Sequence, residues 1–401
     1  MHPLIQKWNS LSLILRIFVG LVLGSILGLV CPQFTGISIL GKLFVSGLKA
    51  VAPVLVAVLV TASIARAKGN LGSRFRVVIG LYMASTLLAA FFAVFFSFLF
   101  PVTITLTDAV SGDSPSGLSE VFSNLLTNMV SNPVQAVANA NYLGVLFWAI
   151  IMGLALKLKG SEQTIQVVGD FSEAISHVVR WVIQCAPLGI MGLVFTSVSE
   201  SGLEIFTEYG KLLAVLVGCM LFSALIKNPA IVALFLRTNP YPLVLKCLKD
   251  SGVNAFFTRS SAANIPINMD LCKRLGVDED FYSVSIPLGS TINMDGASVT
   301  ITVITLAVCN TLGIEVSFLS AIFLSIIATL GACGTSGVAG GSLLLIPMAC
   351  SLFGISNDIA MQAVAVGFII SVVQDSMETA LNSSGDAIFT ATADRFMNKK
   401  K

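Results

Sequence analysis

Apolar residues gather along the chain in runs long enough to cross a lipid bilayer as helices. A helix rises about 1.5 Å per residue, so about 20 apolar residues match the hydrocarbon core of a membrane. Eight stretches meet this requirement, near residues 13–31, 40–64, 76–101, 142–158, 174–198, 210–236, 283–312 and 361–392. The pattern predicts an all-α polytopic membrane protein with eight transmembrane helices.

The charged residues between these spans alternate in sign along the chain. Basic residues follow the second, fourth, sixth and eighth spans: Arg66, Lys68, Arg74 and Arg76, then Lys157 and Lys159, then Arg237, Lys246 and Lys249, and finally Arg395 and Lys399 to Lys401. Acidic residues occupy the intervening loops: Asp108, Asp113, Glu120, Glu200, Glu204 and Glu208. Because lysine and arginine accumulate in cytoplasmic loops, we expect both termini in the cytoplasm. The polar stretch 120–141 is predicted to be a broken helix or an insertion.

Two stretches between the later spans differ from ordinary transmembrane helices. Residues 241–274 are amphipathic and centre on 259–266, where serine, asparagine and proline favour a turn. Residues 317–355 centre on the glycine-rich segment 331–342, and each glycine costs a helix about 1 kcal/mol relative to alanine. Basic flanks place both ends of the first stretch in the cytoplasm, and both ends of the second are expected outside. We therefore predict two re-entrant hairpins that enter the membrane from opposite faces.

Each predicted hairpin precedes a span that polar residues interrupt. The interruptions are Asn-Met-Asp-Gly at 293–296 and Asn-Ser-Ser-Gly-Asp at 382–386. This repeated order with opposite entry is an inverted repeat, which in transporters indicates a binding site near the membrane midplane. A flexible loop or a glycine-packed helix pair is the alternative for each stretch.

The composition excludes a soluble protein. Of the 401 residues, 55% are hydrophobic and 11% are charged, whereas soluble domains carry about 25% charged residues. The net charge of +2 gives no electrostatic basis for binding nucleic acid. The eight cysteines lie mostly in apolar runs without CxxC spacing. We interpret them as small core residues rather than as disulfides or a zinc site.

Four acidic residues fall within the last two spans. An ionised side chain at the bilayer centre costs about 3 kcal/mol on insertion scales, so such residues are usually functional. In the final span, polar residues recur at helical spacing and share one face: Ser371, Asp375, Thr379, Asn382 and Asp386. Asp295 and Glu378 are the other two acids. Such a stripe of oxygens suits a hard cation and an ammonium group; interhelical hydrogen bonding is the alternative.

The C-terminal half resembles the dicarboxylate/amino acid:cation symporter family, which shares the sodium:dicarboxylate symporter fold. Three motifs carry the resemblance: Phe-Thr-Arg-Ser-Ser at 257–261, Pro-Leu-Gly-Ser-Thr-Ile-Asn-Met-Asp-Gly at 287–296, and Gly-Thr-x-Gly-Val at 334–338. Asn382 and Asp386 follow with the family's separation. The N-terminal half is similar to the sodium-coupled serine/threonine branch of this family.

The resemblance implies three sodium sites and no catalytic residue. The first comprises carbonyls of Gly289, Asn293 and Asn382 and the carboxylate of Asp386. The second comprises carbonyls of Thr291, Ala332, Cys333 and Thr335, and forms when the outer hairpin closes. The third comprises Asp295, Asn293, Tyr82, Ser85 and Thr86. In this family sodium is a co-transported ion.

The resemblance also assigns the substrate contacts. Asp375 would receive the substrate ammonium, and Asn382 would bind its α-carboxylate. Ser261 and Val338 would make backbone contacts at the hairpin tips. The remaining expected contacts are Arg259, Ser260, Ala297, Gly340, Glu378 and Thr379.

Two departures from the family pattern bear on the substrate. Members that carry acidic substrates have an arginine where this chain has Glu378, and a threonine where it has Ala297. A glutamate would repel an acidic substrate strongly in a dry pocket. We therefore expect small neutral amino acids, serine and threonine. Pairing with Arg259 is the alternative role of Glu378, and sodium- or proton-coupled transport of acidic amino acids or dicarboxylates is the alternative function.

The resemblance further implies a homotrimer in a bacterial inner membrane, surrounded by lipid, with an elevator-type movement in each subunit. Residues 1–240 would form mainly the scaffold and trimerisation region, with the third and sixth spans partly in the transport domain. Residues 241–395 would form that domain, and 396–401 a cytoplasmic tail. Its parts would be hairpin 1 (241–274), span 7 (281–312), hairpin 2 (317–355) and span 8 (357–394).

Two other functional classes agree less well with the sequence. Residues 334–337 fit the GxSG pattern of intramembrane serine proteases, but a serine nucleophile needs a nearby base. The histidines are His2 and His177, both far upstream, so we expect no enzyme. Re-entrant loops also build channels, although a pore gains nothing from buried acids that require occupancy. The carboxylates alone do not distinguish sodium from proton coupling.

Overall fold

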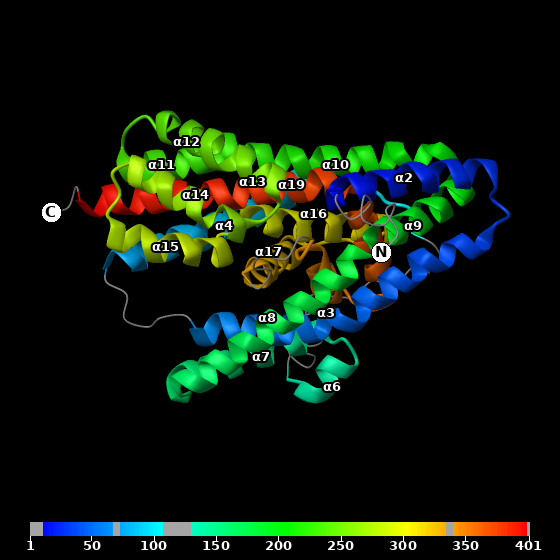
Figure 1. Ribbon diagram of the computed structural model, residues 1–401, viewed down its shortest axis with the longest axis horizontal. Helices are drawn as coiled ribbons and strands as arrows, with labels where there is room; N and C mark the ends of the chain where they lie inside the picture. Colours follow the sequence, from blue (N-terminus) through cyan, green and yellow to red (C-terminus); the bar gives the residue numbers. More distant parts are fainter. Residues whose placement is uncertain (1–10, 67–72, 107–129, 334–339, 399–401) are drawn as a thin grey trace.

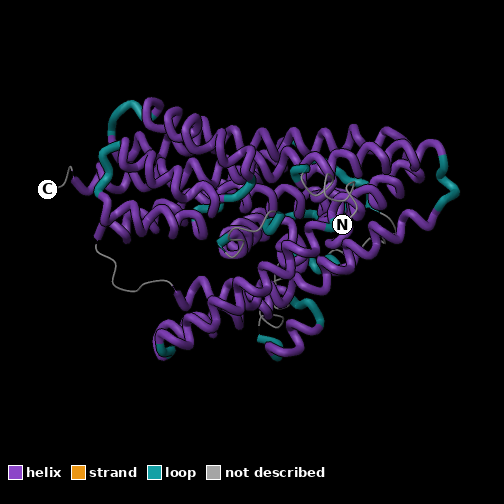
Figure 2. Tube along the Cα trace, in the orientation of Figure 1, coloured by secondary structure: helices purple, strands orange, loops and turns teal. Residues whose placement is uncertain are grey.

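The computed structural model describes residues 11–66, 73–106, 130–333 and 340–398, and the regular structure in these ranges is helical throughout (Figure 2). The first half contains α2 (Leu13–Val30), η1 (Thr35–Ile37), α3 (Ser38–Arg66), α4 (Ser73–Leu99), α6 (Pro133–Ala138), α7 (Tyr142–Lys159), α8 (Glu162–Gln184), α9 (Ala186–Ser201) and η2 (Gly202–Glu204). The prediction of an all-α protein is confirmed for the described residues.

The second half begins with α10 (Ile205–Phe222), the π-helical turn η3 (Ser223–Lys227), α11 (Asn228–Leu236), α12 (Tyr241–Cys247), the π-helical turn η4 (Leu248–Gly252), α13 (Val253–Thr258) and α14 (Ser261–Arg274). It continues with α15 (Glu279–Ile292), α16 (Asp295–Leu312), α17 (Phe318–Ala332), η5 (Leu343–Leu345), α18 (Ile346–Ser351) and α19 (Asn357–Asn398).

Helix α19 is the central element of the molecule. It contacts α4, α10, α11 and α13 to α16, and most of its side chains are buried. In Figure 1 these helices run alongside it, whereas α3, α7 and α8 pack together in an oblique layer. A helix that is buried on all sides has no lipid-facing stripe, so α19 can carry polar residues that meet partners on its neighbours.

Five helices are long and apolar enough to cross a membrane: Thr35–Arg66, Ser73–Leu99, Gly202–Leu236, Glu279–Leu312 and Asn357–Asn398. They correspond to the second, third, sixth, seventh and eighth predicted spans. The first and fourth predicted spans form α2 and α7, which are helices of 18 residues each. A multi-pass membrane protein is therefore confirmed, and the number eight stays a prediction.

The fifth predicted span, 174–198, is not one straight helix. It falls on α8 and α9, which are bent by 51° where they meet, and counting this pair as one span gives six. Pro187 lies in the first turn of α9. Since proline has no N–H to donate to the carbonyl four residues earlier and its ring clashes there, the helix cannot continue straight.

The two predicted polar interruptions have different outcomes. The first is confirmed, because α15 ends at Ile292, α16 begins at Asp295, and the two residues between them are not helical. The second, at 382–386, is wrong, because α19 is an unbroken helix through these residues. Its polar side chains find partners on other helices: Asn264 Nδ2 lies 2.7 Å from Ser383 Oγ, and Asn268 Nδ2 donates to the Ser383 carbonyl over 2.9 Å. Polar residues satisfied in this way do not compete with the helix's own hydrogen bonds.

The predicted hairpin segments both contain helical arms. In 241–274 the chain reverses at Arg259, whose φ of +51° is left-handed, and α14 returns against α13 and η4. In 317–355 the arms are α17 on one side and η5 with α18 on the other. The tip of this second segment, 334–339, lies outside the described residues. Within 120–141 the described part contains only the short helix α6, capped by Asn132.

Helices α2 and α9 approach each other closely because glycine recurs every fourth residue along α2. A Cβ at Gly20 or Gly24 would overlap the carbonyl oxygens of Pro187 or Met191, and one at Gly28 would lie 2.9 Å from the Phe195 oxygen. Small residues at this spacing let membrane helices pack backbone to backbone.

Gly24→Ala should therefore destabilise the protein by about 1–3 kcal/mol, because the two helices must separate to admit the methyl group. Gly210→Ala is the matched control, since nothing lies within 4 Å of a Cβ there. The melting temperatures of the purified proteins in detergent measure the effect. Equal melting temperatures for the two variants would show that α2 and α9 are not in close contact.

Candidate functional site

The break between α15 and α16 places Asn293 against the middle of α19. The Asn293 side-chain amide donates to the Asn382 carbonyl over 2.9 Å and to Asp386 Oδ1 over 3.0 Å. The backbone N–H of Gly296, in the first turn of α16, donates to Asn382 Oδ1 over 2.7 Å. The structure thus brings together Asn293, Asn382 and Asp386, which the sequence analysis grouped in one sodium site.

Two glycines permit this close packing. A Cβ on Gly289 would lie 2.9 Å from Asp386 Oδ1 and 2.8 Å from the Tyr82 hydroxyl oxygen. A Cβ on Gly385 would lie 2.5 Å from the Asn293 amide nitrogen. Larger residues at either position would push the polar side chains apart. Gly289 therefore lies beside the predicted ligands, as expected.

Two oxygens of this cluster are buried without a hydrogen-bond partner among the described residues. They are Asn293 Oδ1 and Asp386 Oδ2. No salt bridge reaches Asp386 in this part of the chain, although its residue is only 1% exposed. A buried carboxylate without a cation is costly. Amide and carboxylate oxygens are the ligands that hard cations prefer, so this pair of oxygens can bind a small cation.

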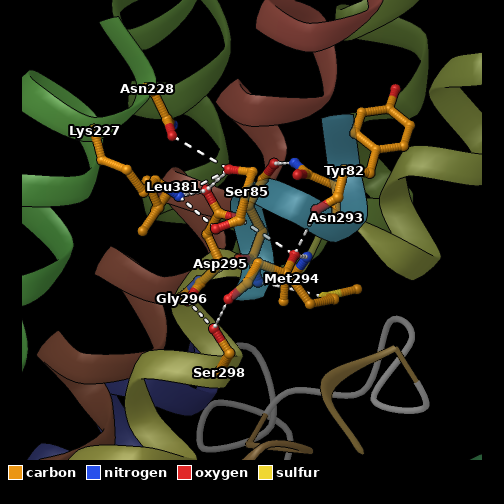
Figure 3. Close-up of polar contacts among 12 residues, drawn as sticks. Tyr82, Ser85, Lys227, Asn228, Asn293, Met294, Asp295, Gly296, Ser298 and Leu381 are labelled. Carbon is orange, nitrogen blue, oxygen red and sulfur yellow. Dashed lines mark hydrogen bonds and ion pairs between the residues drawn. The ribbon is translucent and has the colours of Figure 1, made fainter. Parts of the chain in front are cut away.

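Asp295 has a different environment. Its Oδ2 lies 2.6 Å from the Lys227 ammonium, and the two side chains are 0% and 2% exposed. Ser85 Oγ donates to the same oxygen over 2.7 Å, and Thr86 Oγ1 lies 3.3 Å from Oδ1 (Figure 3). Ser85, Thr86 and Asp295 are therefore together, as the sequence analysis expected for the third sodium site.

Tyr82 does not join that group. Its hydroxyl lies 2.8 Å from Thr390 Oγ1 and 3.2 Å from the Ser285 carbonyl, and in Figure 3 it points away from Asp295. The Asn293 side chain also faces Asp386 rather than Asp295. Of the five residues assigned to the third site, three lie together: Asp295 and the two residues that contact its carboxylate, Ser85 and Thr86.

Lys227 was absent from the predicted site. It lies within the sixth predicted span, which was assigned from its apolar residues without regard to the lysine in its interior. An ionisable residue inside a membrane span is a candidate functional residue by default, and that signal was available in the sequence.

Asp375 forms a buried ion pair with Arg259. Arg259 Nε donates to Asp375 Oδ2 over 2.7 Å, and these side chains are 8% and 3% exposed. The Gly340 N–H donates to Asp375 Oδ1 over 3.2 Å. The acid expected to receive the substrate ammonium is thus held by a cation from one predicted hairpin tip and an amide from the other. Ser260 caps the helix that Ser261 begins, by accepting from Ala263 N–H.

Glu378 is bound by neutral donors. Its Oε2 accepts from Thr300 Oγ1 and Ser342 Oγ, each over 2.8 Å, and from Gln374 Nε2 over 2.6 Å. The alternative that Glu378 pairs with Arg259 is wrong in this structure, because the guanidinium is engaged by Asp375. Gln374 and Thr300 were also missed, although Gln374 lies four residues before Glu378 on the same helix.

The remaining predicted residues lie around this centre. Thr379 donates to its own helix, at the Asp375 carbonyl over 2.8 Å, and Ala297 is completely buried in α16. Cys333 Sγ lies 3.6 Å from the Ile292 carbonyl, so the end of α17, with Ala332, adjoins the α15 terminus that holds Thr291. Thr335 and Val338 lie outside the described residues.

Arg259→Ala should destabilise the protein by about 3–5 kcal/mol, because it leaves the Asp375 carboxylate buried and unpaired. Adding Asp375→Asn should recover part of this loss. Arg274→Ala is the control, since its pairs with Asp250 and Asp270 are exposed and worth about 1 kcal/mol or less. Thermal unfolding in detergent measures all of these. If Arg259→Ala costs no more than Arg274→Ala, the buried pair is not maintained in solution.

Comparison with known proteins identifies the family of this chain. The profile of the sodium:dicarboxylate symporter family matches residues 13–396. A protein of Bifidobacterium adolescentis named serine/threonine transporter SstT is 57% identical over 96% of this chain and 90% of its own length. A protein of the same name from Streptococcus agalactiae is 54% identical over the full length of both chains. This chain is therefore a transporter rather than an enzyme, and it belongs to the sodium:dicarboxylate symporter family.

Proposed function

We propose that the chain is a secondary active transporter that carries serine and threonine into the cell together with sodium ions. The observation that carries the sodium proposal is the buried pair of unpartnered oxygens, Asn293 Oδ1 and Asp386 Oδ2, within the described residues. The substrate proposal follows the names of the two close relatives and the presence of Glu378 where an arginine would grip an acidic side chain.

A sodium ion at Asp386 would balance its buried charge and satisfy both oxygens. Asn293 would then be fixed between the ion and the Asn382 carbonyl, which already accepts its amide. Because Asn382 also binds the Gly296 N–H, the ion would order the α15–α16 break and the adjacent part of α19 together. Ion binding in this way prepares the surface on which the amino acid is held.

The amino acid would bind where Arg259 now meets Asp375. Its ammonium group would replace Arg259 as the partner of Asp375. The Gly340 amide and the Asn382 side chain would donate hydrogen bonds to its α-carboxylate. Among the described residues the donors to Glu378 all reach Oε2. Its other oxygen would accept a hydrogen bond from the substrate hydroxyl, which selects serine and threonine over aspartate.

Coupling follows from the cost of an uncompensated charge. Without the ion, the buried Asp386 carboxylate would have no cation, so movement of a half-loaded site is disfavoured. Each charge that moves inward gains about 2.3 kcal/mol per 100 mV of membrane potential. A channel would need neither the ion nor the buried acids.

The proposed architecture is eight transmembrane helices and two oppositely oriented re-entrant hairpins in an inverted repeat, with the hairpins at 241–274 and 317–355. Residues 1–240 would be mainly scaffold and 241–395 the transport domain, which slides like an elevator in each subunit of a homotrimer. Helices α2, α3, α7, α8 and α9 pack mainly against one another, and α2, α3 and α9 contact α19 less extensively, which supports this division. Both termini would be cytoplasmic and the membrane the bacterial inner membrane.

Purified protein in liposomes should accumulate radiolabelled serine against its gradient when an inward sodium gradient is imposed. A potassium or pH gradient should drive little uptake. Asp386→Asn should lower sodium-driven uptake by at least about tenfold, because loss of one charge-assisted ligand costs about 1.5–3 kcal/mol. Asp358→Asn is the control, since that acid is 81% exposed on the same helix.

Uptake driven equally by a pH gradient would favour proton coupling, and equilibration without accumulation would favour a channel. Unchanged sodium dependence in Asp386→Asn would contradict the ion site.

The pair Glu378→Arg with Ala297→Thr should gain aspartate uptake and lose serine uptake, because arginine would grip the substrate carboxylate that glutamate repels. Glu378→Gln removes the repulsion without adding a cation that pairs with the substrate carboxylate, so this variant should gain little aspartate uptake. Competition of unlabelled aspartate with radiolabelled serine measures the change. A double variant that keeps serine and gains no aspartate would show that position 378 does not read the side chain.

A further inference from the structure

A lysine ammonium lies against Asp295 and Ser85, two of the residues to which the family resemblance assigns a sodium ion. The Lys227 Nζ is 2.6 Å from Asp295 Oδ2, 2.8 Å from Ser85 Oγ and 2.9 Å from the Ser85 carbonyl. An ammonium group has three N–H donors, and here it has three oxygen acceptors. These oxygens are of the kinds expected around an alkali cation, namely a carboxylate, a hydroxyl and a carbonyl.

The local helix geometry brings Lys227 to this place. Residues 223–227 form a π-helical turn, and the following Asn228-Pro229 removes one backbone donor. The carbonyl of Leu225, four residues before Pro229, instead lies 3.2 Å from the Tyr241 hydroxyl. Such turns insert one residue into a helix and often occur at functional sites. The turn directs Lys227 inward, beside Asn228, whose Oδ1 lies 3.4 Å from Ser85 Oγ.

Five acids of α16 and α19 are buried, and they differ in how their charge is balanced. Asp394, near the end of α19, lies 3.3 Å from the Arg74 guanidinium. Asp295 is paired with Lys227 and Asp375 with Arg259. Among the described residues, Asp386 and Glu378 have no salt bridge. Asp386 and Asn293 hold the unpartnered oxygens, whereas no oxygen of Asp295 is left without a partner. A mobile cation is therefore needed at Asp386 and not at Asp295.

We propose that Lys227 replaces a sodium ion at Asp295. This chain would then bind one sodium ion fewer than a chain that also binds sodium at Asp295, and the sodium ion that drives transport would bind at Asp386. This rests on the proposed sodium-coupled transport. A tethered ammonium keeps the Ser85–Asp295 contact formed whether or not sodium is present. The contact between α4 and α16 then stays constant through the cycle, and sodium orders only the Asn293–Asp386 side of the break.

The test is the number of ²²Na⁺ ions bound per chain at saturation, measured on the purified full-length protein. Lys227→Met should bind one ion more than the unsubstituted protein, because it leaves the oxygens of Asp295 and Ser85 facing an empty position. The double variant Lys227→Met with Asp295→Asn lacks the carboxylate and should bind the same number of ions as the unsubstituted protein. The single variant Lys227→Arg keeps the cation and should also bind that number. Lys211→Met, on the exposed face of α10, is the matched control and should leave the count unchanged.

Thermal unfolding in sodium and in choline chloride gives a second reading. Sodium should stabilise Lys227→Met more than it stabilises the unsubstituted protein, since the ion would replace the lost ammonium. A purely structural lysine would instead lower stability equally in both salts.

The proposal is overturned if Lys227→Met binds no additional ion, or is unfolded in both salts while the double variant with Asp295→Asn folds. It is also overturned if Asp295→Asn alone lowers the ion count by one. Failure of the proposed function is distinguishable, because the unsubstituted protein would then bind no sodium and show no sodium-driven uptake of serine.

Discussion

The structure depends on the burial of carboxylates among apolar helices, four of them around the candidate site. A charge removed from water without compensation is far more costly than any single packing defect. Each acid must therefore meet a cation, a set of hydrogen-bond donors or a mobile ion. Asp295 and Asp375 meet tethered cations, Glu378 meets three neutral donors, and Asp386 meets the Asn293 amide with one oxygen left over. The arrangement of helices around α19 follows from these needs.

Departures from regular helix geometry supply most of these partners. The break before Asp295 turns Asn293 toward Asp386, the π-helical turn at 223–227 turns Lys227 toward Asp295, and the left-handed residue between α13 and α14 is Arg259 itself. Irregular backbone at membrane depth is tolerated only where protein or water satisfies it. Here each irregular segment lies against a buried acid, so the cost of the irregularity and the cost of the buried charge are offset by the same contact.

The difference between acids paired with a side-chain cation and acids without one has a functional consequence in the proposed mechanism. Lys227 would hold α16 at Asp295 throughout the cycle, whereas a mobile ion at Asp386 would hold its neighbours only while it is bound. Only a site for a mobile ion can change the affinity of a neighbouring substrate site when the ion binds. In the proposed mechanism, Asp386 is joined to the substrate site through Asn293 and Asn382, so ion binding would order Asn382 on the same helix as Asp375.

The sequence by itself determined the membrane character, most helix positions and the break at 293–294, because hydrophobic runs and local motifs carry this information. The grouping of Asn293, Asn382 and Asp386 came from the family resemblance of these motifs. The sequence could not decide which cation meets which acid. Arg259 pairs with Asp375 rather than Glu378, Lys227 reaches Asp295 from another span, and residues 382–386 stay helical because Asn264 and Asn268 satisfy Ser383. These outcomes depend on contacts between residues more than 60 positions apart, and only the tertiary packing sets their distances.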